Sequence, residues 1–123
     1  MTNIDVIRTF CEAWSRRDPD ELAEFFTADG VYHNMPIQPV KGQDKVRVFI
    51  QNFLANWTDT DWVILSMAEA GGVVFCERID KTKTTAGDVD LPCVGVFEMH
   101  EGKIRVWRDY FDMGTFTRAM EAE

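Results

Sequence analysis

The chain has 123 residues, of which 46% are hydrophobic and 28% are charged. This length suits a single domain over residues 1–123, and the composition excludes a disordered or collagen-like chain. Thirteen basic residues against 21 acidic ones give a net charge of −8, which disfavours nucleic acid and anionic membranes as partners.

No apolar run approaches the roughly 20 residues of a membrane-crossing helix. The first residues lack the basic start and apolar stretch of a secretory signal, so a cytoplasmic location is expected. The three cysteines, Cys11, Cys76 and Cys93, form no CxxC pair, and only two histidines are available to join them. We therefore interpret the cysteines as small buried side chains and predict no metal site.

Apolar residues at helical spacing predict a first helix, formed by Ile4, Ile7, Phe10, Cys11 and Trp14. A second, short helix is predicted to follow Asp18, which suits the N-cap, and Pro19, which suits the first helical position. Its apolar face would comprise Leu22, Phe25 and Phe26, and the Ala28-Asp29-Gly30 sequence would end it.

Residues 31–35 are predicted to form a short strand that stops before Pro36. The alternation of side chains along this strand places Tyr32 and Asn34 on one face. After Gly42 the helical period returns, and a third helix is predicted from the spacing of Val46, Phe49, Ile50, Phe53, Leu54 and Trp57.

The remainder of the chain is mostly strand. Residues 62–67 and 73–80 flank a Gly-Gly turn, and residues 93–100 and 103–111 flank a Glu-Gly turn, so each pair predicts a hairpin. Residues 82–88 are polar and are predicted to form a loop. Asp112 is suited to cap a closing helical turn that contains Phe116, Ala119 and Met120. This order of elements favours an α+β fold with helices on one face of a curved sheet.

Charged residues stand at strand positions where the pattern predicts apolar ones. Arg78 and Asp80 share one face of their strand, while Arg105, Trp107, Asp109 and Phe111 share one face of the last strand. A carboxylate between aromatic side chains is costly unless it is paired. Two carboxylates bridged by one guanidinium can hold a single proton unequally, which supplies a general acid and a general base at once.

The sequence offers no activated nucleophile. It contains no GxSxG motif, and neither histidine lies near a serine or cysteine in the sequence. Water is therefore the natural nucleophile for a reaction at the predicted acid pair. A solvated strand face remains the alternative interpretation of the Arg78 and Asp80 spacing.

Three blocks of the sequence resemble the motif blocks of the limonene-1,2-epoxide hydrolase family, namely residues 32–36 (YHNMP), 77–80 (ERID) and 107–112 (WRDYFD). The similarity extends from the first helix to about Phe116. The resemblance implies a cone-shaped α+β domain like nuclear transport factor 2, with a curved mixed β-sheet and helices enclosing a deep apolar pocket. It also implies cofactor-free, one-step conversion of a small apolar or cyclic epoxide to a vicinal diol, without a covalent intermediate.

The resemblance carries over five catalytic positions. Asp109 would be the base that deprotonates water, and Tyr32 and Asn34 would fix the position of that water. Asp80 would donate a proton to the epoxide oxygen, and Arg78 would bridge the two carboxylates.

The resemblance also implies a substrate pocket and a homodimer formed through the sheet. The candidate pocket residues that it supplies are Phe53, Trp57, Trp62, Leu91, Cys93, Phe111 and Phe116. Thr82 and Lys83 are polar where an apolar wall is expected.

Three other functions fit the same element order, because one fold hosts many activities. The first is an isomerase or cyclase of the ketosteroid-isomerase or polyketide-cyclase type, against which an arginine between two acids argues. The second is a non-catalytic carrier of an apolar ligand, and the third is an assembly module that uses the sheet face. The size of the chain and the missing nucleophile motif exclude the classical two-domain epoxide hydrolases.

Overall fold

The computed structural model describes residues 1–121. The elements in chain order are α1 (Asn3–Ala13), a 3₁₀ turn (Trp14–Arg16), α2 (Pro19–Ala23), β1 (Phe26–Asn34), β2 (Val40–Lys41), α3 (Gln43–Phe53), β3 (Trp57–Ala70), β4 (Val73–Thr84), β5 (Asp88–His100), β6 (Lys103–Phe111) and α4 (Met113–Met120). Among the described residues, none of the helices combines the length and the apolar character that crossing a bilayer requires.

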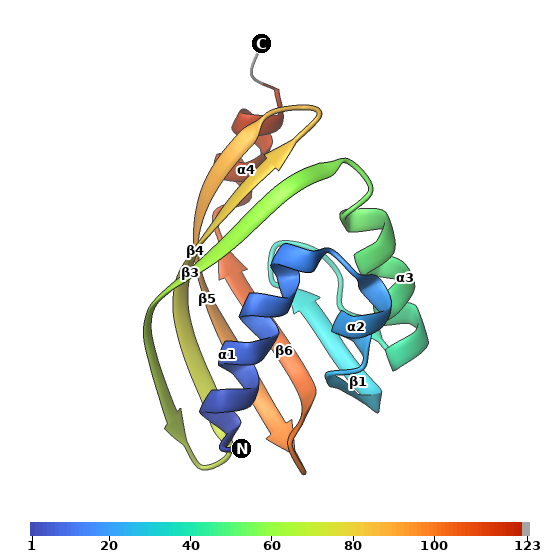
Figure 1. Cartoon of the computed structure of the whole chain (residues 1–123), viewed down its shortest axis with the longest axis vertical. Coiled ribbons are helices and arrows are strands. Elements are labelled where there is room, and N and C mark those ends of the chain that lie inside the picture. Colours follow the sequence, from blue (N-terminus) through green and yellow to red (C-terminus); the bar gives the residue numbers. More distant parts are fainter. Residues whose placement is uncertain (122–123) are drawn as a thin grey trace.

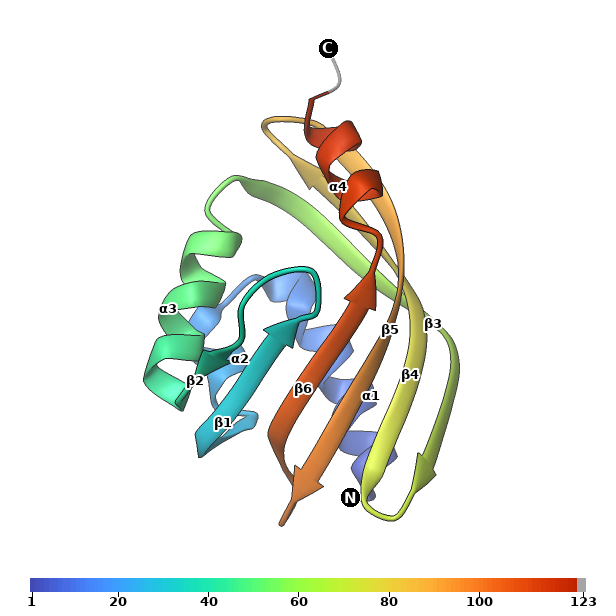
Figure 2. The same cartoon turned by 180° about the vertical axis from the view of Figure 1, so that it is seen from behind.

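The strands form one mixed sheet in the order β2-β1-β6-β5-β4-β3. β1 and β6 are parallel, and the other neighbouring pairs are antiparallel. Helices α1, α2 and α3 lie over one face of the curved sheet (Figure 1), and from the opposite side the strands stand in front of α1 (Figure 2). The predicted α+β class, with a curved mixed sheet and helices on one face, is confirmed.

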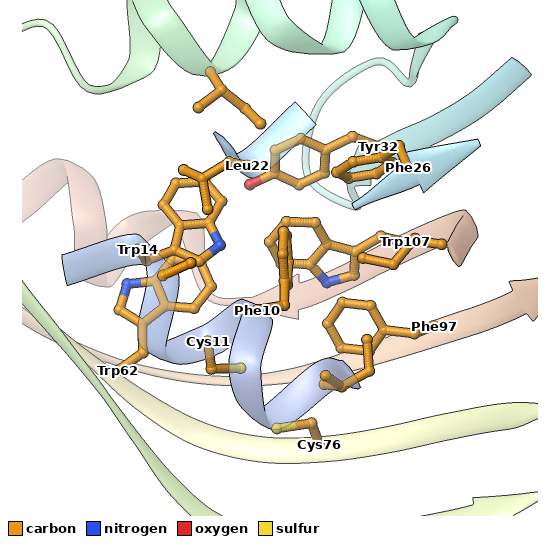
Figure 3. Close-up of a cluster of buried hydrophobic side chains, with 14 of the residues drawn as sticks. Phe10, Cys11, Trp14, Leu22, Phe26, Tyr32, Trp62, Cys76, Phe97 and Trp107 are labelled. Carbon is orange, nitrogen blue, oxygen red and sulfur yellow. The ribbon is translucent and has the colours of Figure 1, made fainter. Parts of the chain in front are cut away.

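An aromatic core fills the space between the helices and the sheet (Figure 3). Trp14 of the 3₁₀ turn stacks on Trp62 of β3 with ring centroids 4.2 Å apart, and Tyr32 of β1 stacks on Trp107 of β6 at the same separation. Phe10 of α1 meets Trp107 edge-on at 5.2 Å. Since burial of one large apolar side chain stabilises a fold by about 1.5–3 kcal/mol, these contacts fix the strands that carry the site.

Both predicted hairpin turns are confirmed. Gly71 and Gly72 have φ angles of 57° and 79°, and Glu101 and Gly102 have φ angles of 49° and 78°. Left-handed backbone at both central residues is the geometry of a type I′ turn, whose twist matches that of the flanking strands.

The predicted helix starts at Asp18 and Asp112 are also confirmed. The Asp18 carboxylate accepts the backbone N–H of Asp20 at 3.0 Å, and the Asp112 carboxylate accepts the N–H of Thr115 at 3.1 Å. Each cap satisfies an N–H that the first helical turn leaves without a partner.

The predicted second helix is wrong beyond Ala23. Phe26 opens β1 and pairs with Ile104 of β6, and residues 28–30 lie within β1. The register of this pair is irregular between Phe26 and Val31. Residues 28–30, whose types are also typical of a helix end, therefore mark an irregularity within a strand here.

The third helix is shorter than predicted. It ends at Phe53, and Trp57 opens β3. The Trp57 ring still packs against Phe53, with centroids 5.0 Å apart. Trp57 fits the helical spacing because its ring packs against Phe53 of α3, although Trp57 itself belongs to the next element, β3.

The loop predicted over residues 82–88 is wrong. β4 continues to Thr84 and β5 begins at Asp88, so that only residues 85–87 lie between the strands. Thr82 pairs with Val89 on one side and with Thr60 on the other. The polar residues of this segment follow strand alternation, with Thr82 buried and Lys83 exposed.

β5 extends five residues ahead of its predicted start and contains Pro92. Pro92 pairs with Ile79 of β4, whereas the pairing of β5 with β6 begins only at Cys93. At Pro92, β5 therefore has no neighbouring strand on the side of β6. The missing N–H of proline breaks no interstrand hydrogen bond there.

The predicted alternation of β6 fails at its start. Ile104 is buried and Arg105 is exposed, because the β5–β6 register slips between Glu98 and Met99. From Trp107 onward the side chains alternate between the two faces as predicted, so Asp109 lies on the helix-covered face.

Candidate active site

The sheet brings all five predicted catalytic residues together on its helix-covered face. Tyr32 lies beside Trp107, and Asn34 lies beside Asp109, across the parallel β1–β6 pair. Arg78 and Asp80 enter from β4. All five side chains are buried, and Arg78 has no exposed surface.

Arg78 bridges the two carboxylates. Its Nε and Nη2 donate to the two oxygens of Asp80 at 2.8 and 3.1 Å, and the same Nη2 donates to Asp109 Oδ2 at 2.7 Å. The guanidinium carbon lies 4.4 Å from the centre of the Trp62 ring. Paired hydrogen bonds and a stacked aromatic face hold a guanidinium in one orientation.

Gly95 makes this bridge possible. β5 separates β4 from β6, so Arg78 must cross two interstrand spacings, about 10 Å, to reach Asp109. At the crossing point β5 presents Gly95, which pairs with Asp109, and a Cβ there would lie 2.8 Å from Arg78 Nη1. Sequence reasoning missed this residue, although a glycine inside a strand is a recognised sign of close approach.

The buried charges favour one shared proton. Two carboxylates and one guanidinium carry a net charge of −1 when all are ionised, and a proton on one carboxyl makes the group neutral. Burial raises the pKa of Asp80 to about 6, where the Arg78 charge opposes the rise and the Asp109 charge adds to it. Burial also raises the pKa of Asp109, against the opposing charge of Arg78. Although burial disfavours its charge, the two carboxylates raise the pKa of Arg78 well above its ordinary value.

One oxygen of the bridged carboxylates accepts no hydrogen bond from the described residues. Among residues 1–121, buried Asp109 Oδ1 has no hydrogen-bond partner. A buried acceptor without a partner marks a place for a donor such as water. Burial, together with the charge of Asp109, raises the pKa of Tyr32 well above its ordinary value, so its hydroxyl keeps its proton.

A largely apolar cavity opens onto these polar groups. Its empty space, counted to the open mouth and including solvent there, is about 550 Å³. Asn34, Asp80 and Asp109 are part of its lining. Six of the seven predicted pocket residues also line it, namely Phe53, Trp57, Trp62, Leu91, Phe111 and Phe116.

Sequence reasoning missed three lining residues, Ile37, Val89 and Met113, whereas Thr82 lines the cavity as the expected polar residue in its wall. Val89 continues the alternation of Leu91 along β5, which was the available signal, but the loop predicted over residues 82–88 concealed it. Nothing in the local pattern singles out Ile37.

Cys93, the seventh predicted pocket residue, does not line the cavity. Its sulfur points to the backbone carbonyl oxygens of Leu91 and Arg78, at 3.6 and 3.8 Å. Burial raises the pKa of this thiol, which therefore stays protonated. Cys93 contributes a small side chain beneath the carboxylates.

Asp80, Cys93 and Asp109 place possible metal-ligand atoms within 4.8 Å of one another. The Arg78 guanidinium already bonds to both carboxylates, so a metal cation at this point would meet a fixed positive charge. The donor set therefore favours the arginine bridge over a metal ion.

The fold belongs to a class that solved structures from other organisms share. A protein from Shewanella denitrificans that is assigned as a SnoaL-like polyketide cyclase superposes with a TM-score of 0.88 at 14% identity, covering 98% of both chains. A hypothetical protein from Catenulispora acidiphila with a ketosteroid-isomerase-like fold superposes with a TM-score of 0.86 at 16% identity, covering 96% of this chain and 93% of that one. Likeness at these identities shows the fold alone.

Within that class, a match to a family model identifies the family of this chain. Residues 1–121 match the family described as limonene-1,2-epoxide hydrolase catalytic domain, and the chain belongs to this family. Epoxide hydrolase EphG of Mycobacterium tuberculosis is 26% identical over 107 residues, which cover 87% of this chain and 71% of that protein. A solved LEH-like epoxide hydrolase from M. tuberculosis has a TM-score of 0.83 at 24% identity, covering 96% and 88% of the two chains. The resemblance of the three sequence blocks is thus confirmed, and family membership supports epoxide hydrolysis as the class of activity.

Proposed function

We propose that this protein hydrolyses a small, largely apolar epoxide to a vicinal diol in one step, with water as the nucleophile. The observation that carries the proposal is the Arg78 bridge between two buried carboxyl groups at the end of an apolar cavity. A neutral substrate fits the apolar walls, and the carboxyl pair supplies an acid and a base at its polar end.

In the proposed reaction Asp80 carries the shared proton. It donates that proton to the epoxide oxygen as the C–O bond breaks, which removes the negative charge that would develop there. Asp109 takes a proton from the attacking water through Oδ1, its free oxygen. Tyr32 and Asn34, which lie on the neighbouring strand, hold that water in line with the carbon under attack.

The direct test is diol formation in ¹⁸O-labelled water from limonene 1,2-epoxide, cyclohexene oxide and styrene oxide. With enzyme in excess over epoxide, the first turnover is expected to place the label in the diol, and cyclohexene oxide is expected to give the trans-diol. A first diol without any label, in which the second oxygen comes from a carboxylate, would indicate a covalent carboxyl ester and contradict the proposal. Binding of the epoxides without any turnover would favour a carrier of apolar ligands.

The pH dependence of the reaction follows from the raised pKa of Asp80. Because Asp80 must be protonated to act as the acid, kcat/KM is expected to fall as the pH rises above about 6. It is also expected to fall toward low pH, where Asp109 becomes protonated and ceases to act as a base. Initial rates of diol formation from pH 4 to 9, corrected for spontaneous hydrolysis, check this, and a rate that stays constant up to pH 9 would contradict it.

The homodimer implied by the resemblance stays a prediction. The face of β3–β6 that lies away from the helices exposes four large apolar side chains, Leu65, Phe75, Val94 and Tyr110. We propose this face as the contact between two copies, which the mass of the protein in solution tests directly.

A further inference from the structure

One wall of the cavity carries a pair of buried threonines. Thr82 of β4 lines the cavity, while Thr60 of β3 lies behind it, outside the lining, with 1% of its surface exposed. Their hydroxyl oxygens are 2.8 Å apart. The indole Nε1 of Trp62 donates to Thr60 Oγ1 at 3.1 Å.

A count of donors and acceptors orients these hydroxyl groups. Thr60 accepts the hydrogen bond from Trp62, and in residues 1–121 the acceptor within reach of the Thr60 hydroxyl proton is Thr82 Oγ1. The reverse orientation would leave the Thr60 proton buried without an acceptor, which is costly. Thr60 therefore donates to Thr82, and the hydroxyl of Thr82, a residue that lines the cavity, keeps its own proton without an acceptor among residues 1–121.

We infer that Thr82 donates a hydrogen bond to the substrate, and that the preferred substrate is an epoxide bearing a second oxygen that accepts hydrogen bonds, such as a ketone. Asp80 and Thr82 are two residues apart on the same face of β4, so the second oxygen lies about 7 Å from the epoxide oxygen. The inference rests on the proposed function, because it specifies the substrate class of the same site.

A hydrocarbon against Thr82 would bury the free donor without a partner, whereas a carbonyl oxygen would accept its hydrogen bond. Sites built around such a donor discriminate strongly against analogues that lack the acceptor. Val89 and Leu91, which also line the cavity, are apolar.

The test compares limonene 1,2-epoxide with its methyl ketone analogue, in which an oxygen replaces the terminal =CH₂ of the isopropenyl group. The two molecules have nearly the same shape. The ratio of kcat/KM for the ketone to kcat/KM for the hydrocarbon is expected to be about ten in the wild type, the order of magnitude for one hydrogen bond. Thr82→Val is expected to lower this ratio to about one, and Thr82→Ser, which restores the hydroxyl, is expected to recover it. Comparing two substrates within each variant cancels any general loss of activity.

A wild-type ratio near one, or the same ratio in Thr82→Val, would overturn the inference. If the wild type hydrolyses neither epoxide, the proposed function fails and the inference is tested by binding alone. Tryptophan fluorescence then gives Kd for cyclohexyl methyl ketone and for isopropenylcyclohexane, neither of which carries an epoxide. Tighter binding of the ketone, lost in Thr82→Val, is the expected result, and equal binding of the two would overturn it.

Discussion

Replacing Asp80 by asparagine is expected to lower kcat for diol formation by about 10²–10⁴-fold, the usual contribution of a general acid. Asparagine has nearly the same shape, and its amide oxygen still accepts the hydrogen bond that Arg78 Nε now donates to Asp80 Oδ1 at 2.8 Å. It carries no carboxyl proton to give to the epoxide oxygen. The remaining pair of Arg78 and Asp109 is neutral, so the variant is expected to keep its fold.

Chromatographic analysis of diol from the same epoxide panel measures this effect. A matched control is Asp90→Asn, which makes the same change at an exposed position of β5 and is expected to leave the rate within about twofold, as for a surface substitution. Thermal unfolding of both variants checks that the fold is intact. If Asp80→Asn retained most of the wild-type rate, the proton would come from another group, and the assignment of Asp80 as the acid would be wrong.

Replacing Gly95 by alanine is expected to impair both stability and activity. The added Cβ would lie 2.7 Å from the Phe97 ring, 2.8 Å from Arg78 Nη1 and 3.0 Å from Trp107 Nε1. None of these groups is free to move, because all three side chains are fully buried. Such overpacking costs about 1–3 kcal/mol of unfolding free energy. A displacement of Arg78 by about 1 Å would also lower kcat/KM by about 10²-fold.

Denaturant unfolding and steady-state kinetics together check the Gly95→Ala prediction. Val48→Ala is a suitable control, because this side chain lies at an exposed position of α3, outside the site and outside the proposed contact between two copies. The control is expected to change the rate little, even where it lowers stability. Wild-type stability and activity in Gly95→Ala would show that the bridge does not need the space that the glycine leaves.

Much of the candidate site follows from local patterns. The period of two along a strand is enough to place Arg78 with Asp80, and Tyr32 with Asn34. Glycine-containing turns were enough to predict the two hairpins, β3–β4 and β5–β6, but not the pairing of β4 with β5 that joins them. The face of the sheet on which Asp109 lies is predicted correctly, because the register slip between β5 and β6 comes before Trp107.

What could not be predicted depends on pairing between distant segments. The importance of Gly95 becomes visible only when β5 is placed between β4 and β6. Thr82 has the polar neighbours typical of a loop, and its burial follows from pairing with Thr60, 22 residues earlier in the chain. Phe26 and Trp57 were placed in helices for the same reason, since nothing near them in sequence shows the strands they join.

The shared hydrogen bonds of Arg78 have a consequence for the complete proposed cycle. One turnover moves a proton off Asp80 and adds another to Asp109, so the diol leaves behind a pair whose protonation is reversed. Arg78 Nη2 touches both carboxyl groups, but a guanidinium does not give up its protons and so cannot return one. The pair is therefore reset through water that enters the cavity after the diol leaves. Each molecule of substrate thus finds a competent site only after the previous product has gone and water has restored the proton to Asp80.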